Sequence, residues 1–147
     1  MSKYKLATGD LTETFFEDAS ILGLVAPVSD YQMCWHLNNA LCFDFRNNPD
    51  LTVPLRKKNL DTTFYFRVAE YRERYTSLAH YLYNNQFAGE QLLPEFKQLD
   101  YVWLMKGDMI PDSHLNNLAE IINAISCVRM VIQIAPQSIK NKNHLIF

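Results

Sequence analysis

The spacing of apolar residues divides the chain into segments with helical and strand periodicity. Residues 21–26 form an apolar run short enough for a buried strand, and Pro27 ends it. From Asp30, apolar residues recur every three or four positions, which predicts an amphipathic helix ending near Cys42. The side chains expected on its buried face are Tyr31, Cys34, Trp35, Leu37 and Leu41. Residues 43–59 show no regular period.

Residues 64–71 and 78–83 alternate between apolar and polar side chains on either side of a charged bend at residues 72–74. This alternation predicts an antiparallel β-hairpin with one buried face. The apolar residues expected beneath the predicted helices are Phe64, Phe66, Val68, Leu78 and Leu82. The opposite face would then carry four tyrosines, Tyr65, Tyr71, Tyr81 and Tyr83.

The last third of the chain predicts a strand, a helix and a further strand. Residues 101–105 are apolar, and a second amphipathic helix is expected from Asp112 or Ser113 to about Ile125. Residues 128–134 then alternate between apolar and polar side chains. The short connections between these elements predict a right-handed βαβ unit.

Together these elements predict one α+β domain over residues 1–147, with a further short strand at residues 4–7. The sheet is expected to be mostly antiparallel, with both helices on one face. This arrangement is a ferredoxin-like or ACT-like sandwich with an extra strand. The chain has no internal repeat and no linker-like segment.

Composition narrows the class of protein further. With 48% hydrophobic residues, the chain has enough apolar material for a core without a stabilising metal or disulfide. Its net charge of −2 weighs against general attraction to nucleic acid or anionic lipid. Three cysteines without C-x-x-C spacing favour a reducing compartment. With no apolar segment typical of a signal peptide or a membrane span, the expected location is the cytoplasm.

Two short segments around Pro94 carry a resemblance to a known family. The sequence Leu93-Pro94-Glu95, followed after three residues by Leu99-Asp100-Tyr101, resembles the signature of the IPExxxVDY family of small bacterial proteins. Leu93 stands where the signature has Ile, and Leu99 where it has Val. Residues 29–41, 101–107 and 143–147 are also similar to that family. The resemblance implies no activity and supplies no catalytic residues, since the family has no assigned activity.

Glu95 and Asp100 are the carboxylate pair to consider for acid–base catalysis. Five residues apart across a turn that Pro94 begins, they could lie close together, and two close carboxylates would separate their pKa values. His80 is a further catalytic candidate, because it shares the face of Leu78 and Leu82 and is expected to be buried, although a hydrogen-bonded core histidine is the favoured interpretation. The alternative is that both carboxylates accept hydrogen bonds from the backbone at element boundaries, and this structural interpretation is favoured.

No metal or cofactor is expected from the sequence. Cys34 and His36 would point about 200° apart on a helix, so the two residues cannot share one tetrahedral site. Cys34 and Cys42 are interpreted as core residues. The chain has neither a P-loop nor a G-x-G-x-x-G motif, which weighs against nucleotide hydrolysis.

The predicted tyrosine face is the main functional candidate. Tyr65, Tyr81 and Tyr83, together with Trp103 and Arg67, would form a surface of the kind that anchors protein interfaces. A homodimer is the simplest partner, and another protein is the alternative. Single-stranded nucleic acid is a rival ligand, although the net charge weighs against it. It also remains open that this face is covered by the predicted N-terminal strand, by residues 43–59 or by the segment Leu145-Ile146-Phe147. The sequence therefore favours a binding module, with a small enzyme using the carboxylates as the alternative.

Overall fold

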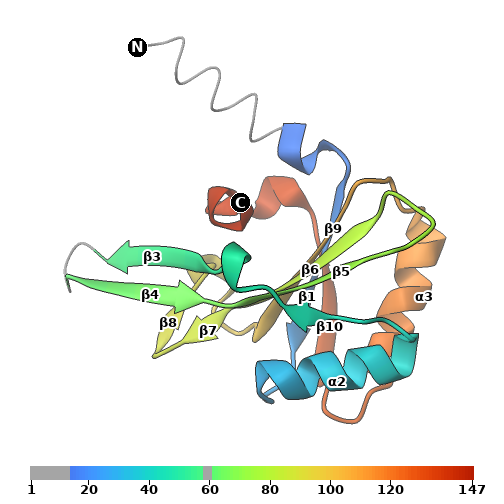
Figure 1. Cartoon of the computed structure of the whole chain (residues 1–147), viewed down its shortest axis with the longest axis horizontal. Coiled ribbons are helices and arrows are strands. Elements are labelled where there is room, and N and C mark those ends of the chain that lie inside the picture. Colours follow the sequence, from blue (N-terminus) through green and yellow to red (C-terminus); the bar gives the residue numbers. More distant parts are fainter. Residues whose placement is uncertain (1–13, 58–60) are drawn as a thin grey trace.

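An antiparallel sheet runs through the centre of the described part of the protein (Figure 1). The structure, a computed structural model, describes residues 14–57 and 61–147. The strands of this sheet are β1 (Ala19–Val25), β2 (Arg46–Asn47), β5 (Val68–Arg72), β6 (Ala79–Asn84), β9 (Tyr101–Lys106) and β10 (Met130–Ile134). Their order across the sheet is β10-β1-β9-β6-β5-β2, and every neighbouring pair is antiparallel.

The helices α2 (Asp30–Leu41) and α3 (Asp112–Asn123) cover the same face of this sheet. Helix α2 begins after Ser29, whose backbone N–H donates to the side-chain oxygen of Gln32 at 3.2 Å. The sheet residues buried against the helices include Leu22, Leu24, Leu82, Tyr101, Trp103 and Met105. The helix residues that meet them are Met33 and Leu37 of α2 and Leu115, Leu118 and Ile122 of α3. The predicted α+β fold with two helices on one face is therefore confirmed.

The strands β1, β6, β9 and β10 follow the ferredoxin-like order of elements. Along the chain they run strand, helix, strand, strand, helix, strand, and in space β1 and β9 are central. Strands β9 and β10 are parallel to each other, as the predicted βαβ unit requires, but β1 lies between them and pairs with both. The additional strands β5 and β2 extend the sheet beyond β6.

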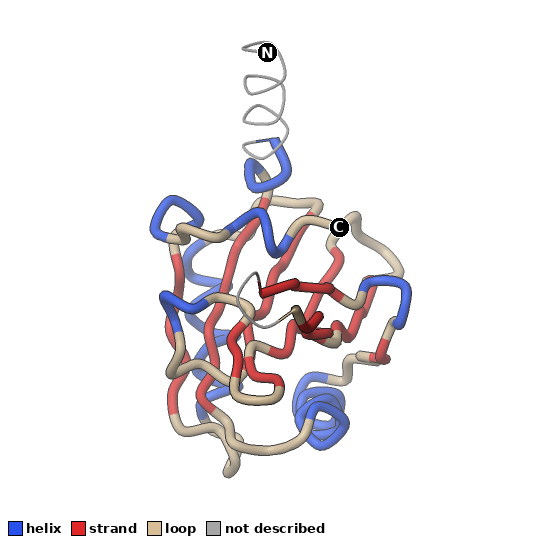
Figure 2. The backbone as a smooth tube through the Cα atoms, turned by 90° about the vertical axis from the view of Figure 1, so that its left-hand side faces the viewer, coloured by secondary structure: helices blue, strands red, loops and turns tan. Residues whose placement is uncertain are grey.

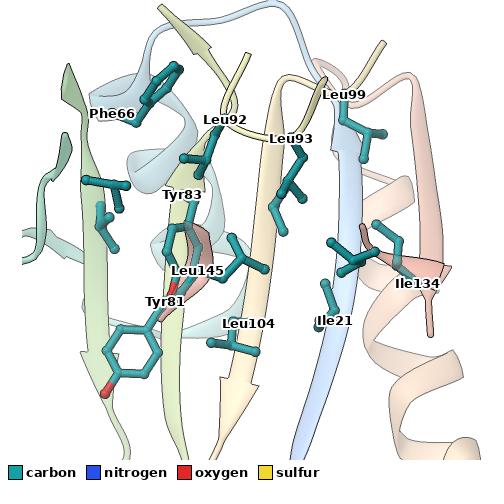
Figure 3. Packing of buried hydrophobic residues seen from close by; sticks show 14 of the residues in the cluster. Ile21, Phe66, Tyr81, Tyr83, Leu92, Leu93, Leu99, Leu104, Ile134 and Leu145 are labelled. Carbon is teal, nitrogen blue, oxygen red and sulfur yellow. The ribbon is translucent and has the colours of Figure 1, made fainter. Parts of the chain in front are cut away.

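The other face of the sheet is covered by three segments that are distant in sequence (Figures 2 and 3). These segments are the hairpin of β3 (Val53–Lys57) and β4 (Thr62–Phe66), the residues around Leu92, Leu93 and Leu99, and the C-terminal residues around Ile139 and Leu145. In Figure 3, Leu92 and Leu145 lie beside Tyr83 of β6, and Leu93 and Tyr81 belong to the same core cluster. The sheet is therefore buried on both faces.

The predicted facing of the first half of the hairpin is wrong. Phe64, Phe66 and Val68 belong to the core opposite the helices, whereas Leu82 does lie beneath the helices. The register explains the position of Val68, because Val68 pairs with Tyr83 and paired residues point to the same face. Phe64 and Phe66 lie on β4, which pairs with β3 in a separate sheet. A shift of one residue in the register moves a whole strand to the other face.

A small hairpin follows β6 directly. Strand β7 (Gln86–Phe87) and β8 (Glu90–Gln91) are joined by Ala88 and Gly89, which have φ angles of 52° and 82°. Positive φ at both central residues is the geometry of a two-residue hairpin turn. The remaining elements are short 3₁₀ turns, η1 (Pro49–Leu51), η2 (Pro94–Phe96), η3 (Pro136–Ser138) and η4 (Lys142–Leu145).

The strand expected at residues 4–7 lies outside the described residues. Residues 43–59, which have no clear sequence period, contain β2, η1 and β3. Among the described helices, none has the length and apolar character needed to cross a bilayer.

Candidate functional site

Two aromatic side chains of α2 remain exposed. Tyr31 is 73% exposed and Trp35 is 61% exposed, although the sequence pattern placed both on the buried face of the helix. That prediction is wrong, because Met33 and Leu37 form the buried stripe instead. Positions 31 and 35 lie two residues before 33 and 37, which is about 200° around a helix. The two aromatic residues are one turn apart and therefore share the solvent face.

These aromatic side chains border a cleft of about 320 Å³ between α2 and the strands β5 and β6, which we call the α2 cleft. Apolar side chains from the sheet and from the segment after α2 contribute to its walls. The lining residues are Asp30, Tyr31, Cys34, Trp35, Asn38, Phe45, Asn47, Arg67, Ala69, Leu82 and Asn84. A cleft of this volume lies at the lower end of the range for ligand pockets and is large enough for one large side chain of a partner.

Polar contacts hold the walls of the α2 cleft in place. Asn38 of α2 accepts a hydrogen bond from the backbone N–H of Phe45 at 2.7 Å and donates to its carbonyl at 3.2 Å. The guanidinium of Arg67 pairs with the carboxylate of Asp30 at 3.3 Å. Arg67 remains more than half exposed, whereas the Asp30 side chain is only 18% exposed. The cleft therefore offers an accessible positive group beside an apolar surface.

Cys34 is the nucleophilic residue type in the α2 cleft, but it is not activated. Burial, reinforced by the nearby carboxylate of Asp30, raises the pKa of the Cys34 thiol to about 11. The thiol is therefore protonated near neutral pH, and the thiolate is the reactive form of cysteine. Cys34 is therefore a half-buried wall residue of the cleft.

The predicted tyrosine face does not exist as an exposed surface. Tyr81 is 4% exposed, and Tyr83 is fully buried beneath Leu145. Trp103 is also fully buried, on the opposite, helix-covered face of the sheet. Tyr65 is exposed, but it lies on β4 in the separate β3–β4 hairpin. These four residues therefore do not form one surface, and three of them cannot contact a partner or stack on bases while buried.

Arg67 is the one predicted interface residue that lies at the α2 cleft. The exposed aromatic residues beside it, Tyr31 and Trp35, were missed because their spacing also fits a buried helix face. The sequence does contain a pattern that indicates the observed orientation of α2, because Met33 and Leu37 form a second apolar stripe with the same four-residue spacing.

The proposed carboxylate pair is not brought together as an acid–base site. Glu95 accepts hydrogen bonds from the backbone N–H and the side-chain amide of Asn141, at 2.8 and 2.9 Å. Burial alone would raise the pKa of Glu95, but these hydrogen bonds outweigh it and lower the pKa. Asp100 instead accepts the backbone N–H of Ala26, at 2.8 Å, just beyond β1. Each carboxylate thus satisfies a different backbone segment, in agreement with the structural interpretation.

The other residues of the Leu93-to-Tyr101 motif also make structural contacts. Leu93 and Leu99 are fully buried in the core opposite the helices. Tyr101 donates its hydroxyl to the carbonyl of Val28, in the loop that leads into α2. The motif therefore connects the end of β1, the start of α2 and the C-terminal residues near Asn141.

His80 is buried, as predicted, and it lies in a polar network inside the helix-covered core. The indole N–H of Trp103 donates to its Nδ1 at 3.1 Å, and Nε2 lies 2.7 Å from a carboxylate oxygen of Glu73. Because an indole N–H can only donate, Nδ1 is the acceptor and Nε2 carries the proton of a neutral imidazole. Burial lowers the pKa of His80, and this effect exceeds the opposing effect of the Glu73 hydrogen bond and charge. With both ring nitrogens occupied, His80 is positioned as a structural group rather than a base.

We expect the free energy of unfolding to decrease as the pH is lowered below about 6.5, the usual pKa of histidine, because of His80. Burial holds the folded-state pKa of His80 below this usual value, so between the two pKa values the unfolded chain binds a proton that the folded chain excludes. The contribution of neutral His80 to the free energy of unfolding is therefore complete above the pKa that His80 has in the unfolded chain. It is lost as the pH falls toward the lower pKa that His80 has in the folded protein. Urea unfolding at a series of pH values measures this dependence.

A His80→Gln variant provides the comparison, because the amide of Gln can both accept from Trp103 and donate to Glu73. We expect its unfolding free energy to vary less over the same pH range. His114→Gln, on an exposed residue of α3, is the matched control and should keep the wild-type dependence. An equal slope in the wild type and in His80→Gln would contradict this assignment.

Metal-binding residues are not gathered in the described part of the chain. Within residues 14–57 and 61–147, no group of three or more His, Cys, Asp or Glu side chains has the geometry to hold a metal ion. Cys34 is half-buried at the α2 cleft, and Cys42 is exposed at the C-terminal end of α2. The prediction that Cys42 is a core residue is therefore wrong.

Comparisons with protein-family models, with curated proteins and with solved structures found no match for this chain. The candidate site is accordingly defined by the geometry of the chain itself, and it is the α2 cleft with Tyr31, Trp35 and Arg67.

Proposed function

We propose that the protein is a binding module that docks a segment of a partner protein at the α2 cleft. The observation that carries this proposal is the exposure of Tyr31 and Trp35, at 73% and 61%, on the rim of a cleft with an apolar floor. Exposed Trp, Tyr and Arg side chains are the residue types that most often dominate the energy of protein interfaces. An isolated exposed aromatic residue would carry less weight than this cluster beside a cleft.

The chemistry of the cleft specifies the kind of segment that fits. Phe45, Ala69 and Leu82 provide an apolar surface for one aromatic or large aliphatic side chain. Arg67 uses one of its N–H groups for Asp30 and stays more than half exposed, so the remaining donors can bind a carboxylate. The occupant that matches both features is a partner segment with a large apolar residue next to an acidic residue.

The geometry supports binding more than catalysis or nucleic-acid recognition. The Cys34 thiol is held protonated, and Glu95, Asp100 and His80 are each engaged in structural hydrogen bonds. We also propose that the chain is related to the IPExxxVDY family, but this relationship would not imply any activity. Arg67 is the exposed positive group among the residues that line the cleft, which is a weak basis for binding a phosphate backbone.

Selection of a phage-displayed random peptide library on the wild-type protein tests this proposal. We expect enriched peptides to combine a large apolar residue with Asp or Glu. Their dissociation constants should rise about thirtyfold in Trp35→Ala, the effect of removing an interface anchor. Tyr75→Ala is the matched control, because Tyr75 is 95% exposed in the loop after β5, and it should leave binding unchanged.

Tryptophan fluorescence provides an independent readout of the same binding event. The chain has two tryptophans, of which Trp103 is buried and Trp35 is exposed. Peptide binding at the cleft should shift the Trp35 emission to shorter wavelength and protect it from acrylamide. Enriched peptides that bind Trp35→Ala as tightly as the wild type would contradict the proposal, as would a selection that enriches none.

A further inference from the structure

We infer that the open edge of β10 pairs with β10 of a second copy of this chain, in antiparallel orientation, so that two sheets become one. This surface is independent of the α2 cleft. Strand β10 is the first strand of the sheet order and β2 is the last, whereas the α2 cleft lies over β5 and β6 toward the β2 end. Such a dimer would therefore leave both α2 clefts accessible.

The hydrogen-bond register shows which backbone groups of β10 face outward. The carbonyl of Val25 accepts from Arg129 at 2.7 Å, so Val25 points toward β10. Because backbone groups alternate sides along a strand, Gly23 and Ile21 also point toward β10. Their partners in the register are Ile132 and Ile134, which must therefore face β1.

Val131 and Gln133 alternate with Ile132 and Ile134 along β10. Their N–H and C=O groups therefore point away from β1. Within residues 14–57 and 61–147, β10 pairs only with β1. An edge of this kind is a template for the addition of another strand.

Strand β10 lacks the features that usually protect a sheet edge. Its sequence Met-Val-Ile-Gln-Ile contains no charged residue and no proline. Met130 is 39% exposed, and Val131 and Ile132 are partly exposed. The opposite edge of the sheet differs, because β2 has only two residues and carries Arg46, whose side chain is 80% exposed. Short length and exposed charge are common means of preventing edge-to-edge pairing. The β2 edge of the sheet thus has features that prevent pairing with another strand, whereas the sequence of β10 has none of them.

A second copy is the partner that matches this edge. A two-fold axis at Ile132 places Val131 of each copy opposite Gln133 of the other, so all outward N–H and C=O groups of both residues are paired. The same axis places Met130 opposite Ile134, and the two Ile132 side chains opposite each other. Glu120 of α3 and Arg129, which have opposite signs, line a hollow beside Met130 and Val131. Each copy therefore contributes one acid and one base, and the interface is not opposed by net like charge.

Sedimentation equilibrium over about 1 to 200 µM tests this inference, a range that resolves typical dissociation constants for small interfaces. We expect the wild-type chain to form a dimer. In Gln133→Lys, which adds like charges close to the axis, the dimer dissociation constant should rise at least about tenfold. Asn117→Lys adds the same charge to an exposed position of α3 on the side facing α2, and it should not change the dissociation constant.

Amide hydrogen exchange then identifies the interface. The N–H groups of Val131 and Gln133 should become protected as the protein concentration rises, whereas those of Ile132 and Ile134 should be protected at every concentration. A wild-type chain that is monomeric throughout the range would overturn the inference. A dimer that Gln133→Lys leaves intact but Trp35→Ala disrupts would also overturn it, since that dimer forms at the α2 cleft.

Discussion

Replacing Asn85 by Ala is expected to lower the free energy of unfolding by about 3 kcal/mol or more. Asn85 is completely buried directly after β6. Its side-chain amide donates to the carbonyls of Phe96 and Leu99, both at 2.9 Å, and its side-chain oxygen accepts the N–H of Leu93 at 2.8 Å. In the Ala variant the buried N–H of Leu93 loses its partner, whereas the carbonyls of Phe96 and Leu99 keep the hydrogen bonds donated by the N–H of Leu99 and by the side chain of Gln86. A buried N–H without a partner costs about 1–3 kcal/mol, and the two other lost hydrogen bonds and the space left by the amide add to this.

Urea unfolding followed by circular dichroism measures the effect, and Gln86→Ala is the matched control. Gln86 is the next residue, and its amide donates to Lys97 at 2.7 Å and to Leu99 at 2.8 Å. Because Gln86 is partly exposed, water can replace these hydrogen bonds, and we expect a loss of about 1 kcal/mol or less. Equal losses in the two variants would contradict the assigned role of Asn85.

Asn85 also explains why the motif around Pro94 is compatible with a structural role. The side chain of Asn85 binds the motif at Leu93 and Leu99, and its backbone N–H donates to the carbonyl of Asp100 at 2.9 Å. The motif in turn holds Ala26 and Asn141 through its two carboxylates. A cluster of buried and backbone-directed contacts of this kind stabilises the junction of several chain segments, and it leaves none of these groups free for catalysis.

Much of the fold could be predicted because the signals are local. The periodicity of residues 30–41 and of residues 112–123 is a property of each segment alone, and so is the apolar run that becomes β9. The burial of His80 also followed from its position between Leu78 and Leu82. Its partners Glu73 and Trp103 come from a loop and from another strand, so only the tertiary structure brings them to the imidazole.

The candidate site was harder to predict because two apolar stripes compete on α2. Tyr31 and Trp35 have the same four-residue spacing as Met33 and Leu37, and periodicity alone does not decide which pair faces the sheet. Packing decides it, since the unbranched Met33 and the Leu37 side chain fit the helix-covered core, where Trp103 already occupies a large volume. The aromatic pair is left on the solvent face, and this is why the α2 cleft has an aromatic rim.

The tyrosines of β6 were assigned to an exposed face because alternation indicates two faces but not what covers them. The C-terminal residues that cover this face come from more than 50 residues further along the chain, as the 62-residue separation between Tyr83 and Leu145 shows. The alternative in which Leu145-Ile146-Phe147 covers the face agrees with the structure: Leu145 is fully buried, and the ring of Phe147 lies 4.6 Å from that of Tyr81. Burial raises the pKa of Tyr83 well above its usual value, as expected for a phenol removed from water.

Replacing Leu145 by Ala is therefore expected to lower the free energy of unfolding by about 3 kcal/mol, the usual cost of a Leu-to-Ala change in a well-packed core. The side chain of Leu145 is fully buried against the sheet (Figure 3), and its carbonyl accepts a hydrogen bond from the hydroxyl of Tyr83. Thermal and urea unfolding both measure the loss. Phe147→Ala is the control, because Phe147 is 48% exposed and should cost about 1 kcal/mol.

The relative size of these two losses tests whether the C-terminal residues belong to the core. If they cover the sheet only loosely, Leu145→Ala would cost no more than Phe147→Ala, and Tyr81 and Tyr83 would become available to a partner. A large loss in Leu145→Ala alone would mean that Leu145 contributes about as much to stability as an ordinary core residue. The C-terminal residues would then keep Tyr81 and Tyr83 covered. Partner binding would then have to use a surface that is already open, such as the proposed aromatic rim of the α2 cleft or the proposed edge of β10.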